Sequence, residues 1–325
     1  MELDRHGRTI TAVRALRLHG PGDLRVDELP PPVAEDGDVV VEVEVALTGS
    51  AERWAFRSGS DRLDGSPAPV GRELVGIDTR NGLRVVAAAA APCGHCAPCV
   101  ADKEELCRRP FELVGAFAER VAVPARIAEV NLHPVPRGLD PAVAALVDPL
   151  ACCLHAVERA ELRPGSVVAV VGTGPIGLML CACLTDAGGY VAAVGGRTSR
   201  HALAAAFGAR PADPHDADVV VDAAGTEQAR REALDFVQPG GTVLLVGASN
   251  PGEPVAAEAE RVRLEELTLR GAAGHAPRHV RAALAFLASG AYPWERLVTH
   301  EVGLDGVAGL LADPPDDCLK AAVRP

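Results

Sequence analysis

Four of the nine cysteines lie in one short segment with the spacing C-x2-C-x2-C-x7-C: Cys93, Cys96, Cys99 and Cys107. Four thiolates this close together can close a tetrahedral site around Zn²⁺. Four protein ligands leave no open position for a substrate, so the expected ion is structural. The rival interpretation is an iron–sulfur cluster. The ferredoxin run, however, ends in x3-C-P and its fourth cysteine serves another cluster, whereas this sequence holds no second cysteine group.

The remaining five cysteines stand in apolar helical or terminal contexts and are expected to be small core residues: Cys152, Cys153, Cys181, Cys183 and Cys318. His155 lies on a helical run beside two of them. A lone histidine in such a place is expected to pack in the core rather than to act as ligand or base.

A glycine-rich turn follows an apolar run. The segment reads Ser166-Val-Val-Ala-Val-Val-Gly172-Thr-Gly174-Pro175-Ile176-Gly177 and leads into a helical pattern. The glycines permit a tight turn and a close approach of pyrophosphate to the backbone at the helix N-terminus. Because strand, turn and helix come in this order and head further such units, the motif predicts a dinucleotide site rather than an ordinary glycine turn.

The end of the next strand bears on the choice of cofactor. An NAD site carries Asp or Glu there for the ribose 2′-hydroxyl, but the segment reads Val194-Gly195-Gly196-Arg197-Thr198-Ser199-Arg200. Gly195 leaves room for a 2′-phosphate, and Arg197, Ser199 and Arg200 can bind it as donors. The segment therefore predicts NADP(H). The alternative is that the arginines are solvated surface charge.

Two sequence patterns indicate the structural elements that must position these motifs. From Val13 onward, short runs alternate apolar and polar residues, as in VRALRL and DVVVEVEVAL, and predict a β-rich domain. After about Pro141, apolar strands alternate with helical stretches, which predicts a parallel sheet in an α/β fold. The expected organisation is a polar extension over 1–12, a β-rich domain over 13–150 and 292–325 with the cysteine lobe at 93–107, and a dinucleotide-binding domain over 151–291.

Composition limits the partners. The 325 residues are 48% apolar and carry a net charge of −12, which argues against nucleic acid and anionic membranes and leaves a small-molecule substrate. No apolar run is long enough to span a membrane, and the first residues lack the apolar core of a secretory signal. A cytoplasmic protein with reduced thiols is expected.

A β-rich domain with a four-cysteine lobe, then a Rossmann domain and a short return segment, resembles the medium-chain dehydrogenase/reductase superfamily, which includes the zinc-containing alcohol dehydrogenases. The similarity runs from about Val13 to the C-terminus, and the landmarks are GRELVG (71–76), GAFAE (115–119), DPL (148–150) and GGTVLLVG (240–247). The DPL segment is similar to the polyol and cyclitol dehydrogenase branch, which has Glu-Pro-Leu there. The resemblance implies a GroES-like catalytic domain with a doubly wound Rossmann domain, and an NAD(P)-dependent enzyme. It also implies a homodimer, or alternatively a tetramer, that pairs sheet edges at the strand Thr242–Val246.

The departures from this family concern its catalytic zinc site. Thr48 stands where the zinc enzymes have a cysteine ligand, and Arg72 where they have the histidine of Gly-His-Glu. Glu73 is kept, and Asp148 replaces the glutamate of the polyol branch. An arginine keeps its charge and repels a metal ion. The sequence therefore predicts one structural zinc ion and no catalytic one.

Chemistry without this zinc ion needs other groups. Arg72, clamped by Glu73 and Asp148, is expected to stabilise oxyanion charge. Ser50 matches the proton-relay hydroxyl of the family, so Ser50, or a water molecule through Thr48, is the expected proton donor. The alternative for Arg72 is a structural ion pair that fills the former metal pocket.

Three functions follow. The first is an NADPH-dependent reductase of a polarised double bond (C=O, C=N or conjugated C=C) in a small metabolite. The second is a secondary-alcohol or cyclitol dehydrogenase, or a redox epimerase. The third is a non-catalytic NADPH-binding sensor. The relay hydroxyl at Ser50 and the intact cofactor turn favour catalysis.

Overall fold

The computed structural model describes residues 12–60, 62–63, 65–195, 200–210, 213–250, 252–255 and 257–325. They form two compact units. The first comprises the described residues of Met1–Asp148 together with Leu284–Ser289 and Trp294–Pro325, and the second comprises those of Pro149–Ala283 and Gly290–Pro293. The ranges expected from the sequence differ from these units mainly at Leu284–Ser289, which packs with the first unit. No helix in the described ranges is long and apolar enough to span a membrane.

The first unit is built on two β-sheets. The smaller has the order β2-β1-β4, with β1 Val13–Gly20, β2 Asp23–Leu29 and β4 Ala68–Pro69. The larger has the order β10-β6-β5-β3-β17-β16, and β9 also pairs with β3. Its strands are β3 Val39–Leu47, β5 Glu73–Asp78, β6 Arg84–Ala87, β9 Arg120–Val123, β10 Leu132–Pro134, β16 Val298–Gly303 and β17 Lys320–Arg324.

Strand β3 shows why this sequence forms a half-buried sheet. Val39, Val41 and Val43 point into the core of the unit. Glu42 and Glu44 alternate with them on the other face, because successive side chains of a strand point to opposite sides. Glu42 pairs with Arg120 of the neighbouring strand β9, and Glu44 pairs with Arg84 of β6, which lies one strand further along the sheet, beyond β5.

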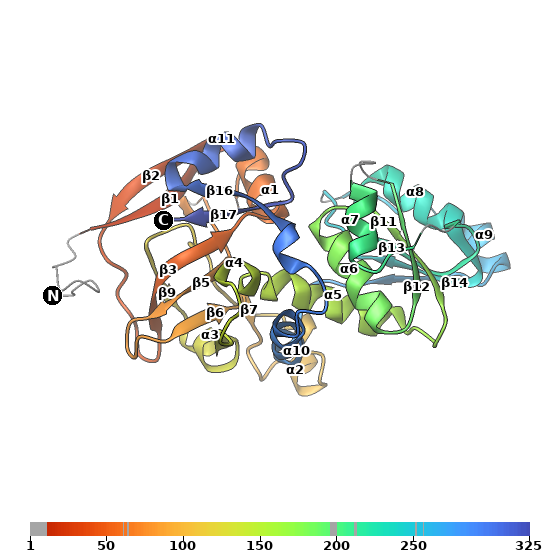
Figure 1. The fold of residues 1–325 in the computed structure, drawn as a ribbon, viewed down its shortest axis with the longest axis horizontal. Helices are drawn as coiled ribbons and strands as arrows, with labels where there is room; N and C mark the ends of the chain where they lie inside the picture. Colours follow the sequence, from red (N-terminus) through yellow and green to blue (C-terminus); the bar gives the residue numbers. More distant parts are fainter. Residues whose placement is uncertain are drawn as a thin grey trace. The chain divides into compact units, whose positions relative to one another are not determined.

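Strand β17, near the C-terminus, is an interior strand of this sheet. It pairs antiparallel with β3, through Ala322 opposite Leu47 and Val323 opposite Ala46, and parallel with β16. Figure 1 shows β17 in blue beside β3 and β16. The chain therefore returns to the end of β3, where the candidate catalytic residues begin.

Short helices and turns complete the first unit. The helices are α1 Ser50–Ser58, α2 Ala97–Val100, α3 Ala125–Val130, α4 Pro141–Ala144 and α11 Val307–Ala312. The 3-10 turns are η1 Glu104–Leu106, η3 Trp294–Leu297 and η4 Leu304–Gly306, and the two-stranded ladder is β7 Ala90–Ala91 with β8 Phe111–Glu112. Helix α5, Val147–Ala160, continues from the first unit into the second.

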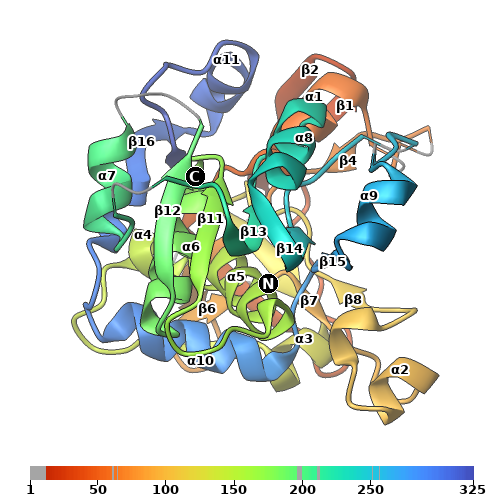
Figure 2. The ribbon, with the colours of Figure 1, turned by 90° about the vertical axis from the view of Figure 1, so that its right-hand side faces the viewer.

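The second unit contains a five-stranded sheet with the order β12-β11-β13-β14-β15, in which every pairing is parallel. The strands are β11 Val167–Val171, β12 Tyr190–Val194, β13 Ala217–Asp222, β14 Val237–Leu245 and β15 Thr268–Gly271. Figure 2 shows them side by side. The helices are α6 Pro175–Asp186, α7 His201–Ala206, α8 Glu227–Phe236, α9 Ala259–Leu264 and α10 Pro277–Ala288. The predicted α/β fold, a GroES-like domain with a Rossmann parallel sheet, is confirmed.

One expectation about this sheet is wrong. The strand around Thr242–Val246 was expected at a sheet edge, but β14 has neighbours on both sides: Val243 lies opposite Val220 of β13 and Leu269 of β15. Strand β15 therefore lies at this end of the described sheet, and its side chain Leu269 is 38% exposed. The sequence did not predict this additional strand, because β15, TLRG, is short and polar and carries a weak strand signal.

Candidate active site, cofactor turn and cysteine lobe

The four cysteines of the lobe come together as predicted. All four Sγ atoms lie within 4.8 Å of one another, with Cys96 Sγ 3.4 Å from Cys99 Sγ and 3.8 Å from Cys107 Sγ. Ligands about 2.3 Å from a tetrahedral Zn²⁺ are separated by about 3.8 Å, so the arrangement fits this ion. Strands β7 and β8 pair on either side of the lobe and fix its ends.

Backbone donors favour a thiolate at Cys96, whereas burial raises the pKa of the Cys99 thiol to about 12. The backbone N–H groups of Arg108 and Cys99 donate to the Cys96 sulfur and lower the pKa of this thiol to about 6. The N–H of Cys93 donates to Cys107 Sγ at 3.2 Å. Metal-binding cysteines must be deprotonated, so these contacts prepare the lobe for a cation.

The glycine turn joins β11 to α6 as the motif predicted. Gly172 has φ +109°, a conformation that L side chains rarely adopt, and a Cβ on Gly177 would stand 1.8 Å from the carbonyl oxygen of Gly172. Gly174 precedes α6, Pro175 begins it and Ile176 follows, and no side chain caps this helix in the described residues. The first N–H groups of α6 are thus left for an anion such as a pyrophosphate, and the site fits a dinucleotide.

The turn after β12 is described only in part. Gly195 has φ +70°, Arg200 immediately precedes α7, and Arg197 and Ser199 lie outside the described residues. The carboxylate of Glu232, which belongs to α8, lies next to this turn. A Cβ on Gly195 would stand 3.7 Å from Glu232 Oε2. The structure therefore places one acid beside Gly195, which a sequence motif confined to the turn could not reveal.

Two of the candidate catalytic residues, Thr48 and Ser50, lie just after the end of β3. The Thr48 hydroxyl accepts a hydrogen bond from the Ala321 N–H at 2.9 Å, and the Thr48 N–H donates to the Ala321 carbonyl at 3.0 Å. Ser50 is the first residue of α1 and is exposed. Thr48 is thus held by β17, whereas Ser50 faces outward from the same turn.

Lys320 is a central residue of the site that sequence reasoning missed. Its Nζ lies 2.8 Å from Glu73 Oε1 and 2.7 Å from Glu73 Oε2, and it donates to the carbonyl oxygen of Thr48 at 3.0 Å. Its side chain is only 4% exposed. The sequence signal for Lys320 is a lone lysine at the start of the last apolar strand, which by itself indicates no partner.

The interpretation that Glu73 and Asp148 clamp Arg72 is wrong. Both oxygens of Glu73 are held by Lys320, and the ion pair of Arg72 within the described chain is with Glu112, at 4.0 Å. Asp148 Oδ1 accepts a hydrogen bond from the Ala89 N–H at 2.7 Å. The Arg72 side chain is 36% exposed, so it is a half-buried cation with a distant partner rather than a plug fixed by two acids.

A second buried carboxyl was also missed. Glu52 lies in the first turn of α1 and is 5% exposed. Burial raises its pKa, against the opposing effects of Lys320, of backbone donors and of Arg72. Burial likewise raises the pKa of Glu73 to about 8, although Lys320 acts in the opposite direction. An acid in the first turn of a helix is common on surfaces, so the sequence gives no sign of its burial.

Three of the candidate residues, Thr48, Arg72 and Glu73, are poor ligands for a catalytic zinc ion, whereas ligand atoms of the fourth, Asp148, and of Cys152 and His275 lie within 4.8 Å of one another. A catalytic site needs about three ligands with an open position. Thr48 offers a neutral hydroxyl already bonded to Ala321, Arg72 is a permanent cation, and the Glu73 oxygens are occupied by Lys320.

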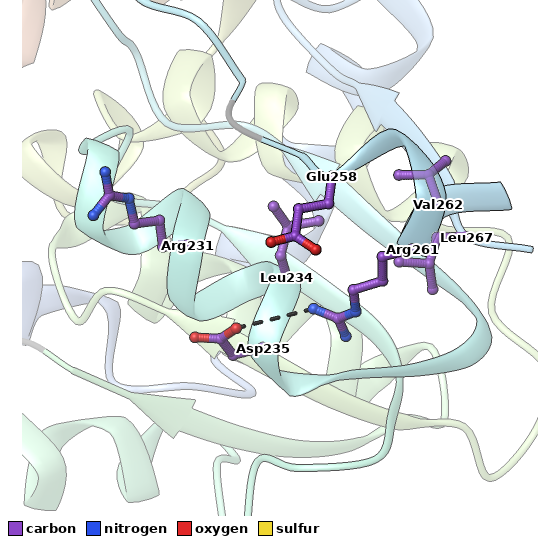
Figure 3. Close-up of a pocket in the computed structure, with 7 residues that line it drawn as sticks. All are labelled: Arg231, Leu234, Asp235, Glu258, Arg261, Val262 and Leu267. Carbon is purple, nitrogen blue, oxygen red and sulfur yellow. Dashed lines mark ion pairs between the residues drawn. The ribbon is translucent and has the colours of Figure 1, made fainter. Parts of the chain in front are cut away.

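A separate pocket of about 380 Å³ opens on the second unit between α8 and α9. Figure 3 shows its lining side chains, among which Asp235 and Arg261 form an ion pair of 3.9 Å. The lining residues are Arg231, Leu234, Asp235, Glu258, Arg261, Val262 and Leu267. None of them was singled out by the sequence, and mixed charges with three aliphatic side chains identify no reaction.

Two family models match the chain. Residues 35–137 match the alcohol dehydrogenase GroES-like domain, and residues 175–289 match the zinc-binding dehydrogenase model. A protein of Mycobacterium tuberculosis assigned to the zinc-binding alcohol dehydrogenases is 30% identical over 327 residues, which cover 91% of this chain and 84% of that protein. Sorbitol dehydrogenase of Bombyx mori is 28% identical, over 89% of this chain and 91% of the relative.

Two solved structures of dehydrogenases are also similar to this chain. A zinc-binding dehydrogenase of Sinorhizobium meliloti, solved with NADP bound, superimposes with a TM-score of 0.87 at 27% identity and covers 97% of this chain and 100% of its own. An alcohol dehydrogenase of Thermus sp. ATN1 superimposes with a TM-score of 0.84 at 28% identity, over 96% of this chain and 99% of its own.

Proposed function

Because this chain belongs to the zinc-type medium-chain dehydrogenase/reductase superfamily of NAD(P)-dependent oxidoreductases, we propose that it uses NADPH to reduce a polarised double bond without a catalytic zinc ion. The substrate is a small metabolite with a C=O, C=N or conjugated C=C bond. The observation that carries the proposal is the engagement of Thr48 and Glu73 by the last strand, together with the cation Arg72 at a ligand position.

The second unit holds the cofactor in this proposal. The glycine turn at Gly172 and the uncapped N-terminus of α6 bind the pyrophosphate. Arg197, Ser199 and Arg200 bind the 2′-phosphate. Bound NADPH supplies the hydride, and the chain supplies binding, orientation and the proton.

The first unit supplies the polar groups. Ser50, exposed at the start of α1, donates the proton to the substrate heteroatom. Arg72, only loosely paired with Glu112, stabilises the negative charge that develops there. The cysteine lobe holds one structural Zn²⁺, which fixes the segment between β7 and β8.

A second candidate is the reverse chemistry, oxidation of a secondary alcohol or cyclitol with NADP⁺. The likeness to sorbitol dehydrogenase favours it. Both candidates use the same residues, and the direction depends on the substrate.

The test combines metal analysis with a substrate screen. The protein is treated with a chelator that removes accessible zinc and is then assayed for NADPH oxidation with aldehydes, ketones, imines and enones, and for NADP⁺ reduction with polyols. We expect reduction of at least one compound class at a rate unchanged by the chelator. A rate that follows the content of a second zinc ion would overturn the zinc-free mechanism.

A further inference from the structure

Two carboxyl groups and one ammonium group converge beneath the turn that carries Ser50. The position that a Cβ on Gly49 would occupy is 3.0 Å from Glu52 Oε2, 3.4 Å from Glu73 Oε1 and 3.7 Å from Lys320 Nζ. Glu52 comes from α1, Glu73 from β5 and Lys320 from β17. Three elements distant in sequence therefore bring their charged ends to one point, and we call these three side chains the carboxyl cluster.

The ammonium of this cluster is fully committed. Lys320 Nζ has three hydrogen atoms to donate, and its three acceptors are the two oxygens of Glu73 and the carbonyl oxygen of Thr48. Glu52 is nonetheless 5% exposed. One buried cation thus faces two buried carboxyls, and a second full negative charge there would meet backbone donors but no further hydrogen atom of the Lys320 ammonium.

The other charged groups that act on the cluster do not compensate the charge of a second ionised carboxyl. Arg72 acts favourably on Glu52, but its side chain is 36% exposed and water screens its charge. Asp148, from α5, acts on Glu73 as a like charge. Burial is the largest effect on both glutamates and raises the pKa of each.

We propose that Glu52 and Glu73 share one exchangeable proton beside a charged Lys320, and that this proton is the one consumed in the reduction. The role of this proton in the reduction rests on the proposed function. The hydride leaves NADPH for the carbon of the double bond, and the π electrons move to its heteroatom. That atom takes the proton of the Ser50 hydroxyl, Ser50 recovers a proton from the cluster, and the cluster recovers its proton from water.

The shared proton is tested without any substrate by infrared difference spectroscopy. A protonated carboxyl has a carbonyl stretch that a carboxylate lacks. At neutral pH we expect this band in the wild type and its loss in both Glu52→Gln and Glu73→Gln, because either change leaves one carboxyl for one ammonium. The matched control is Glu44→Gln, a carboxylate of the same unit paired with Arg84, which should leave the band unchanged.

Two outcomes overturn this assignment. One is a band that survives in Glu52→Gln, and the other is a band that is lost in only one of the two glutamine variants, since a proton shared within the pair requires both. Lys320→Gln gives the converse check: with no ammonium present, the band should grow.

The proton transfer is tested by the pH dependence of NADPH oxidation. In the wild type we expect kcat to fall as the pH rises through about 8, where Glu73 loses its proton. In Glu52→Gln this fall should disappear while the KM for NADPH stays unchanged. If the infrared result holds but no compound is reduced, the proposed function fails and the shared proton stands. If reduction occurs with an identical pH profile in Glu52→Gln, the proton source lies elsewhere.

Discussion

Lys320 holds both carboxylate oxygens of Glu73, at 2.8 and 2.7 Å, across 247 positions of the sequence. The same ammonium donates to the carbonyl oxygen of Thr48, and the next residue, Ala321, bonds the Thr48 hydroxyl. The turn that begins the candidate active site is therefore held in place by the last strand of the first unit.

Replacing Lys320 with Met should lower the free energy of unfolding by about 3 to 5 kcal/mol, the usual cost of removing one partner of a buried pair. Both glutamates then lack their ammonium, and burial raises their pKa above the value in the unfolded chain. The folded variant therefore binds more protons than the unfolded one, and its stability falls as the pH rises.

Urea unfolding at several pH values checks this prediction. The wild type should already lose stability between about pH 4.5 and 8, because the pKa of Glu73 is raised from 4.5 to about 8. Lys320→Met should lose it more steeply, and Lys320→Arg, which keeps the charge, less so. Equal stability of Lys320→Met and wild type at alkaline pH would contradict the buried pair.

The purified protein should contain about one zinc ion per chain, because the four thiolates of the lobe leave no open position. Cys99→Ser should reduce both the zinc content and the stability, since metal binding and folding are coupled. Cys318→Ser, at a buried cysteine outside the lobe, is the matched control and should keep the metal. Elemental analysis that finds two zinc ions, or iron, would refute this assignment.

NADPH should bind more tightly than NADH. In the double variant Arg197→Ala, Arg200→Ala this preference should be lost, because the 2′-phosphate loses its charged donors. Glu232→Gln should change it in the opposite direction, since removing a carboxylate near Gly195 favours an anion. Titration of both cofactors by fluorescence provides the measurement, and a preference that is the same in all three proteins would disprove the role of this turn.

Arg72→Ala should leave cofactor binding intact and lower turnover by about two to three orders of magnitude, the scale of losing one oxyanion stabiliser. Ser50→Ala should cost about two to four orders. Both are measured as kcat on the first substrate that the screen identifies. Full activity of Arg72→Ala would make Arg72 a structural residue paired with Glu112.

We predict a homodimer that pairs through β15 rather than β14, because exposed strand edges need cover. Leu269 is 38% exposed on this strand. Leu269→Lys should shift the mass measured by light scattering toward the monomer, whereas a charge placed at exposed Leu83 of the first unit should not. A wild type that is monomeric at micromolar concentration would refute the dimer.

The sequence revealed those parts of the site that depend on local spacing. The four cysteines lie on one loop, and Gly172 and Gly177 lie on one turn, so their types and separations predict their geometry. The burial of His155, at 4% exposure, also follows from its helical surroundings.

The parts that depend on distant pairing were not predictable from spacing. Lys320 reaches Glu73 only because β17 inserts between β3 and β16, which no local pattern specifies. The predicted pairing of Arg72 with Glu73 was wrong for the same reason, since the cation that binds Glu73 is Lys320, which is distant in the sequence. The burial of Glu52, which is 5% exposed, likewise has no signal in the sequence around it.

Strand order has a consequence for biosynthesis. The ribosome makes β3 and β5 early, then the whole continuous stretch Pro149–Ala283, and only afterwards β16 and β17. The second unit can therefore fold while the first is still missing an interior strand. Until Lys320 leaves the exit tunnel, Glu73 and Glu52 have no buried ammonium to receive them, so the charged centre of the first unit is completed only after the second unit has been synthesised.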